Sequence, residues 1–127
     1  MHYIDLTKFL GTVLGPDYEV VLIDASDEEN SIVAISNGYI SGRTIGAPMT
    51  DMAKEIIANR EYENADSRIN YRSSKGDGTM LRSSTFFIKD SQGELHGMLC
   101  INFDDSRYRE LSDQLLKLRH PDAFVES

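Results

Sequence analysis

The chain has 127 residues and a formal net charge of −8, from 13 lysines and arginines against 21 aspartates and glutamates. This length suits one domain that folds without a metal ion, and a single cysteine excludes an internal disulfide framework. The sequence shows neither a membrane-spanning apolar run nor a signal peptide, so we expect a cytoplasmic protein. The acidic charge argues against direct nucleic-acid binding by this stretch, because phosphate binding requires a basic face.

The first half of the sequence predicts a helix, a hairpin and a second helix. Apolar residues in 6–14 recur at helical spacing, and a glycine-proline pair follows them. Two β-branched runs, 19–24 and 31–36, flank an acidic turn and predict an antiparallel hairpin. The Asn-Gly pair at 37–38 is either another hairpin turn or a kink, and we favour the kink because the following stretch is rich in glycine. A second helix is predicted from about Pro48 by apolar spacing.

The second half predicts three strands and a terminal helix. Residues 69–72 suggest a short strand, and 80–89 with 95–103 form two long strand-like runs joined by a tight turn. A helix is expected over 106–119, ended by the His-Pro pair at 120–121. Helices stand between groups of strands rather than after each strand, so the order predicts an α+β fold with an antiparallel sheet.

Several contiguous blocks resemble the YheO-like PAS domain family. These blocks are 14–22, 31–43, 46–51, 81–90 and 97–104. The resemblance implies a PAS-like fold with about five antiparallel strands, helices on one side, and flanking N- and C-terminal helices. It further implies the N-terminal sensor domain of a bacterial helix-turn-helix transcriptional regulator of the D-arginine-utilisation-repressor type. Residues 1–127 would then be a single PAS-like sensor domain, with the DNA-binding domain absent from this chain.

Polar residues in two places suggest a ligand pocket. The glycine-rich loop after the hairpin can carry binding groups on a rigid scaffold, and the strand at 82–85 holds hydroxyls and a guanidinium among apolar residues. In one interpretation these groups line a pocket, where Arg82 can hold a carboxylate in a bidentate manner. In the alternative, Arg82 faces solvent. The candidate ligand-binding residues are Asn37, Tyr39, Ser41, Arg43, Arg82, Ser84 and Asn102. We expect a small metabolite, such as an amino acid or an organic acid, between the sheet and the helical middle.

No catalytic or metal-binding pattern stands out in the sequence. The three histidines lack the spacing of a metal site, and glycines 38, 42 and 46 do not form a phosphate-binding motif. We interpret Cys100 as a small buried residue, because nothing basic lies next to it in sequence to favour the thiolate. We therefore expect neither an enzyme nor a bound cofactor.

The terminal helix carries an apolar stripe at alternating spacings of three and four. Its members are Tyr108, Leu111, Leu115 and Leu118. Such a stripe either packs into the core or forms a dimer seam that points toward a DNA-binding domain, and we assign it to the interface of a homodimer. The leading hypothesis is a ligand-sensing and dimerisation domain of a regulator, and the alternative is a ligand-free dimerisation or interaction module. Neither hypothesis involves a membrane.

Overall fold

The computed structural model describes residues 3–119, so the predicted helix stop at 120–121 lies outside the described residues. Its helices are α1 (Tyr3–Leu14), α2 (Asp51–Ala58) and α3 (Ser106–Arg119), with short 3₁₀ helices η1 (Gly38–Ile40) and η2 (Glu61–Glu63). Its strands are β1 (Tyr18–Asp24), β2 (Ile32–Ser36), β3 (Ser67–Ser74), β4 (Met80–Lys89) and β5 (Leu95–Phe103). No helix within this range is long and apolar enough to cross a membrane.

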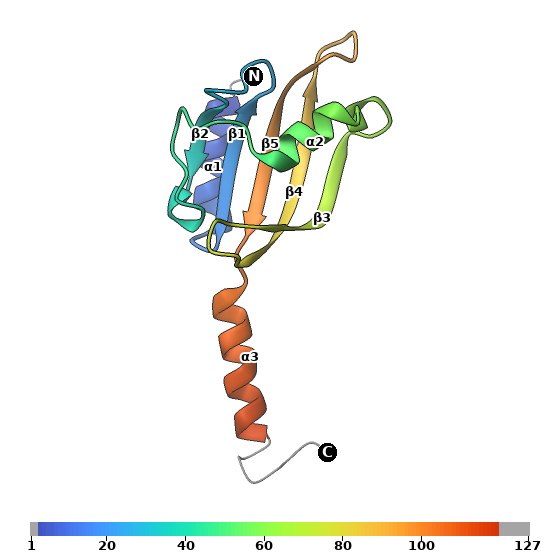
Figure 1. Ribbon diagram of the computed structural model, residues 1–127. Coiled ribbons are helices and arrows are strands. Elements are labelled where there is room, and N and C mark those ends of the chain that lie inside the picture. Colours follow the sequence, from blue (N-terminus) through green and yellow to red (C-terminus); the bar gives the residue numbers. More distant parts are fainter. Residues whose placement is uncertain (1–2, 120–127) are drawn as a thin grey trace.

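The five strands form one sheet in the order β2-β1-β5-β4-β3, and every neighbouring pair is antiparallel. This arrangement confirms the predicted α+β fold. The first and last strand-like segments of the sequence meet at the centre of the sheet, where β1 pairs with β5 over Tyr18–Asp24. Helix α2 crosses one face of the sheet, α1 covers part of the opposite face, and α3 extends away from one end of the sheet (Figure 1).

The sheet is packed on both faces, because alternate residues of a strand point to opposite sides. We call the face under α2 the inner face and the face under α1 the outer face. The inner core consists of Val21, Ile23, Ile32, Met49, Ala53, Ile56, Phe87, Met98 and Cys100. The outer core consists of Val20, Leu22, Ala34, Ile88 and Leu99, on which the apolar side of α1 packs.

The chain leaves the first hairpin through a kink, as the sequence predicted. Asn37 adopts the left-handed conformation, with φ of 57°, and η1 follows directly. The second helix begins at Asp51, where the Thr50 hydroxyl caps it by accepting a hydrogen bond from the Ala53 N–H at 3.1 Å. This kink and this capped helix bring the connecting loop over the inner face, beside the end of β1.

Helix α3 is the element that packs least. None of its residues is buried, and the fractional exposures of Tyr108, Leu111, Leu115 and Leu118 are 49%, 56%, 60% and 80%. The alternative in which this stripe packs into the core of the same chain is therefore wrong. These four side chains are exposed, and the helix that carries them projects from the domain (Figure 1).

Candidate functional site

The inner face holds a cavity of about 680 Å³ beneath the loop that joins η1 to α2. Strands β1, β3, β4 and β5 supply its floor, and Ser41, Arg43 and the start of α2 supply its rim. Its apolar wall includes Val21, Ile23 and Leu81. We refer to this space as the inner cavity.

A fully buried carboxylate, that of Glu19 on β1, organises the polar side of the inner cavity. Its Oε1 accepts a hydrogen bond from Asn102 Nδ2 at 2.9 Å. Its Oε2 accepts bonds from the Ser41 hydroxyl at 2.5 Å and the Ser41 backbone N–H at 3.2 Å. Among residues 3–119, no lysine or arginine forms an ion pair with Glu19. Neutral donors therefore stabilise this buried charge.

The hydrogen bonds of this group have a fixed direction. The Ser83 hydroxyl donates to Asn102 Oδ1 at 2.7 Å, and the Ser73 and Ser83 hydroxyl oxygens lie 2.6 Å apart. Because a hydroxyl has one proton, Ser73 must donate to Ser83. Each hydrogen bond in this series therefore runs in the same donor-to-acceptor direction, from β3 through β4 and β5 to Glu19 on β1. We call Ser73, Ser83, Asn102, Glu19 and Ser41 the Glu19 network.

A second polar row lies beside the Glu19 network. The Thr85 hydroxyl donates to the Cys100 sulfur at 3.3 Å, and the Tyr71 hydroxyl lies 2.7 Å from Thr85 Oγ1. Burial raises the pKa of Tyr71 to about 12 and the pKa of Cys100 to about 11. Both groups are therefore protonated near neutral pH, and Cys100 lacks the thiolate that a reactive cysteine requires.

The structure places three of the predicted ligand-binding residues at the inner cavity. Ser41 and Arg43 stand at the rim after η1, and Asn102 lies on the floor at the end of β5. The Ser41 hydroxyl also accepts a hydrogen bond from the Arg43 backbone N–H at 3.1 Å, which shapes the rim. Loop and strand residues that are 59 or more positions apart thus meet at one hollow.

Arg82 and Ser84 do not lie at the inner cavity, so the prediction that they share a pocket with Asn102 is wrong. Both side chains point to the outer face, because they alternate along β4 with the buried Ser83 and Thr85. Arg82 donates a hydrogen bond to Asn70 Oδ1 at 3.1 Å, and Ser84 accepts one from the Asn70 backbone N–H at 3.0 Å.

Asn37 and Tyr39 also lie apart from the inner cavity, and here too the prediction needs correction. The side-chain nitrogen of Asn37 lies within 3.1 Å of the carbonyl oxygens of Gly11, Gly15 and Tyr18. The Tyr39 hydroxyl donates to the Pro16 carbonyl at 2.6 Å. These two side chains tie η1 to the connection between α1 and β1, so their polar groups are used by the fold itself.

Sequence reasoning missed Glu19, Ser73 and Ser83. The pattern that could have found Glu19 is the period of two in β1, which places it on the same face as Val21 and Ile23. An acidic residue on the face of a strand that is buried on both sides predicts a satisfied, buried carboxylate. The partners of Glu19 come from other strands, and only the strand register reveals them.

The end of β5 connects the inner cavity to α3. Asn102 faces the cavity, whereas the next residue, Phe103, faces outward and contacts the Tyr108 ring at a centroid distance of 5.5 Å. Asp104 then accepts hydrogen bonds from the Ser106 N–H and from Lys75, which lies on the cavity lining, at 3.0 and 3.4 Å. Direct contacts therefore connect Lys75 on the cavity lining, and the strand end that carries Asn102, with the first turn of α3.

An antiparallel sheet of five strands, with a cavity between its inner face and the crossing helical segment, is the architecture of a PAS domain. The chain belongs to the YheO-like PAS domain family, whose family model matches residues 1–120. PAS domains are sensory or interaction modules. This assignment confirms the family that the sequence blocks indicated.

Comparison with solved structures gives the same fold. The PAS domain of a Colwellia psychrerythraea protein aligns with a TM-score of 0.52 at 18% identity, covering 79% of this chain and 91% of that chain. A sensory box histidine kinase/response regulator from Burkholderia thailandensis E264 aligns with a TM-score of 0.51 at 18% identity, covering 88% and 95%. At this identity the likeness shows the fold alone.

Two curated relatives are similar in sequence and have no described activity. The uncharacterized protein YheO of Escherichia coli K12 is 29% identical over 117 residues, which cover 90% of this chain and 48% of the relative. An uncharacterized protein of Haemophilus influenzae is 30% identical over 95 residues, covering 75% and 42%. The chain therefore spans less than half the length of these relatives.

Proposed function

We propose that this chain is the ligand-sensing and dimerisation domain of a bacterial transcriptional regulator that works in the cytoplasm, where its DNA lies. The observation that carries the proposal is the inner cavity with the Glu19 network on its floor. The DNA-binding domain belongs to a part of the protein outside these 127 residues, which is consistent with the greater length of the relatives. In this proposal the chain carries out no catalysis.

The composition of the inner cavity supports binding of a small metabolite. Ligand sites combine apolar walls with a few oriented polar groups, and this cavity combines Val21, Ile23 and Leu81 with the Glu19 network. Asn102 donates one of its two amide protons to Glu19, so its second proton is available to an acceptor on a ligand. Arg43 at the rim adds a positive charge that suits a carboxylate, as in an amino acid or an organic acid.

The route to α3 supports a sensing role. A ligand changes a conformational equilibrium only when it binds the two states unequally. Asn102 and Lys75 both line the inner cavity. Asn102 lies two positions before Asp104, the residue close to the start of α3, and Lys75 forms an ion pair with Asp104. A ligand that contacts these residues acts on the junction from which α3 leaves the sheet.

The exposed stripe of α3 supports dimerisation. Four apolar side chains at heptad spacing, all at least 49% exposed, lie on a helix that has no buried residue. A second copy of the same helix buries such a stripe as a two-stranded coiled coil. The stripe would also place two DNA-binding domains side by side.

A thermal-shift and calorimetry screen against amino acids and organic acids tests the ligand. We expect saturable binding to the wild type, loss of about tenfold or more in affinity for Asn102→Ala through one lost hydrogen bond in a desolvated site, and unchanged affinity for Arg82→Ala. The Arg82→Ala variant is the matched control, since that side chain lies on the outer face. Equal affinity of Asn102→Ala and the wild type would contradict the assignment of the inner cavity.

Analytical ultracentrifugation tests the dimer. We expect the wild type to sediment as a dimer and the Leu111→Glu, Leu115→Glu double variant to be monomeric, because charges in a coiled-coil seam are desolvated without a partner. Leu116→Glu, an exposed position on the same helix but off the stripe, should leave the dimer intact. A dimer without any saturable ligand would favour the alternative, a ligand-free dimerisation module.

A further inference from the structure

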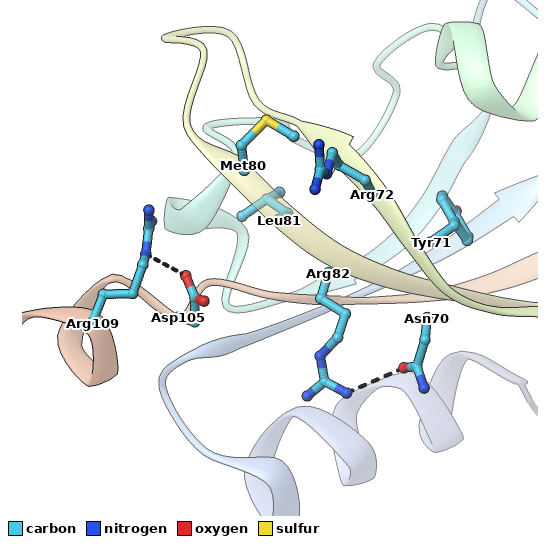
Figure 2. A pocket seen from close by; sticks show the side chains of 8 residues that line it. All are labelled: Asn70, Tyr71, Arg72, Met80, Leu81, Arg82, Asp105 and Arg109. Atoms are coloured by element: carbon cyan, nitrogen blue, oxygen red, sulfur yellow. Dashed lines mark hydrogen bonds and ion pairs between the residues drawn. The ribbon is translucent and has the colours of Figure 1, made fainter. Parts of the chain in front are cut away.

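A second hollow of about 470 Å³ lies where β3 and β4 approach the start of α3 (Figure 2). It shares Tyr71, Arg72, Met80 and Leu81 with the lining of the inner cavity, whereas Arg82, Asp105 and Arg109 line this hollow and not the inner cavity. Three arginines from three elements line it, namely Arg72, Arg82 and Arg109, together with one acidic residue, Asp105. We call this space the arginine hollow.

The charges of the arginine hollow are unbalanced. Arg72 and Arg82 are direct cross-strand partners on β3 and β4, and like charges in directly opposite positions destabilise a sheet. Among residues 3–119, no carboxylate lies within 4.0 Å of either guanidinium. Asp105 pairs with Arg109 at 2.8 Å, so the lining carries three positive charges against one negative charge in a chain whose net charge is −8.

We propose that the arginine hollow binds a small anion with two or more negatively charged oxygen groups, of the di- or tricarboxylate or phosphate type. Guanidinium groups suit both, because their planar N–H pairs match two oxygens at once. An anion that contacts these guanidinium groups offsets the unbalanced positive charge of the lining. The anion site adjoins the proposed metabolite site in the inner cavity and shares Arg72 with it.

Arg82 is held in place before any anion binds. Arg82 donates one N–H to Asn70 Oδ1 at 3.1 Å, and its guanidinium carbon lies 5.0 Å from the centroid of the Phe103 ring. Asn70 has a left-handed backbone, with φ of 53°, at the irregularity that interrupts the pairing of β3 with β4. This irregularity directs Asn70 toward Arg82 (Figure 2). A side chain that is already held loses little conformational freedom on binding.

The arginine hollow joins the sheet to α3. Arg72 and Arg82 belong to the sheet, whereas Arg109 lies in the first turns of α3 and Asp105 precedes it. An anion that contacts arginines from both parts links them. Its binding therefore restricts the direction in which α3 leaves the domain.

Isothermal titration calorimetry with citrate and with pyrophosphate tests this site, and the two anions separate the carboxylate from the phosphate type. We expect saturable binding of at least one of them, about tenfold weaker in Arg72→Gln and in Arg82→Gln through loss of a charged hydrogen bond. Binding should also weaken between about 0.05 M and 0.5 M NaCl through screening. Arg60→Gln, which removes an exposed arginine elsewhere, should bind like the wild type.

Two results would overturn the proposal. The first is the absence of saturable binding of both anions at low salt. The second is equal weakening by Arg60→Gln and Arg82→Gln, which would show attraction to surface charge in general. Chemical-shift changes in ¹⁵N-labelled protein provide a second measurement, since the anion should perturb the amides around Asn70, Arg82 and Arg109. Arg82 and Arg109 do not line the inner cavity, so a failure of metabolite binding there is distinguishable from a failure of anion binding in the arginine hollow.

Discussion

Replacement of Glu19 separates its charge from its hydrogen-bonding role. With Glu19→Gln, the new carbonyl oxygen keeps both donors of Ser41, and the new amide nitrogen faces Asn102. If the Asn102 amide turns by half a rotation, its oxygen accepts from Gln at position 19 and its nitrogen donates to Ser83. Ser83 can then donate to Ser73, so five hydrogen bonds are kept: the two from Ser41 are unchanged, and the three that cross the sheet reverse their direction.

The expected energies follow from this count. Three bonds to a carboxylate become neutral and weaken, but the burial cost of a charge disappears, so Glu19→Gln should change the free energy of unfolding by no more than about 1 kcal/mol. Glu19→Met removes the acceptor and leaves the donors of Ser41 and Asn102 without it. Three unsatisfied donors, at about 1 kcal/mol each, cost about 3 kcal/mol together.

Urea unfolding followed by circular dichroism measures the difference. A loss of about 3 kcal/mol lowers the midpoint by about 1 to 2 M urea for a domain of this size. Glu55→Gln, an exposed position on α2, is the control and should stay within about 0.5 kcal/mol of the wild type. The reasoning is refuted if Glu19→Met is as stable as the wild type, or if Glu19→Gln is destabilised as much as Glu19→Met.

Two other predictions concern packing and pH. Gly11→Ala should lower the free energy of unfolding by about 1–3 kcal/mol, because an added Cβ would lie 2.3 Å from the Ser36 side chain. Gly76→Ala, which has open space around the added Cβ, is the control in the same urea assay. Equal stability of the two variants would contradict the predicted clash. Burial raises the pKa of Cys100 from 9.0 to about 11, so the unfolded chain loses the thiol proton first and stability should fall as pH rises from about 9 to about 11. Cys100→Ala should fall less over that range in unfolding experiments at stepped pH, and an unchanged slope would show that this thiol does not contribute.

Local pattern was sufficient for most of the elements. The helical spacing in 6–14 and 106–119 predicted α1 and α3, and the β-branched runs predicted β1 and β2, because the periodicity of burial is written directly into each segment. The kink at Asn37 was also predictable, because the stretch that follows it is rich in glycine. The contiguous blocks that resemble the YheO-like PAS domain family predicted the PAS-like fold.

The site was less predictable, because a strand pattern shows which residues share a face but not which face is hollow. Ser41, Arg43 and Asn102 were assigned to a pocket and do line the inner cavity. Arg82 and Ser84 were assigned to the same pocket because they belong to one polar cluster on the strand at 82–85. The pleat of β4 directs their side chains to the outer face instead. Only the pairing of β4 with β5 shows that Ser83 is the residue facing Asn102.

The amino-acid sequence by itself determined the secondary structure, the acidic charge and the family, because each of these depends on residues close together in the chain. The tertiary structure alone decided that a carboxylate on β1 would meet an amide 83 positions later, and that three arginines would face one hollow. These contacts depend on strand order and register, which join segments whose local patterns contain no information about each other.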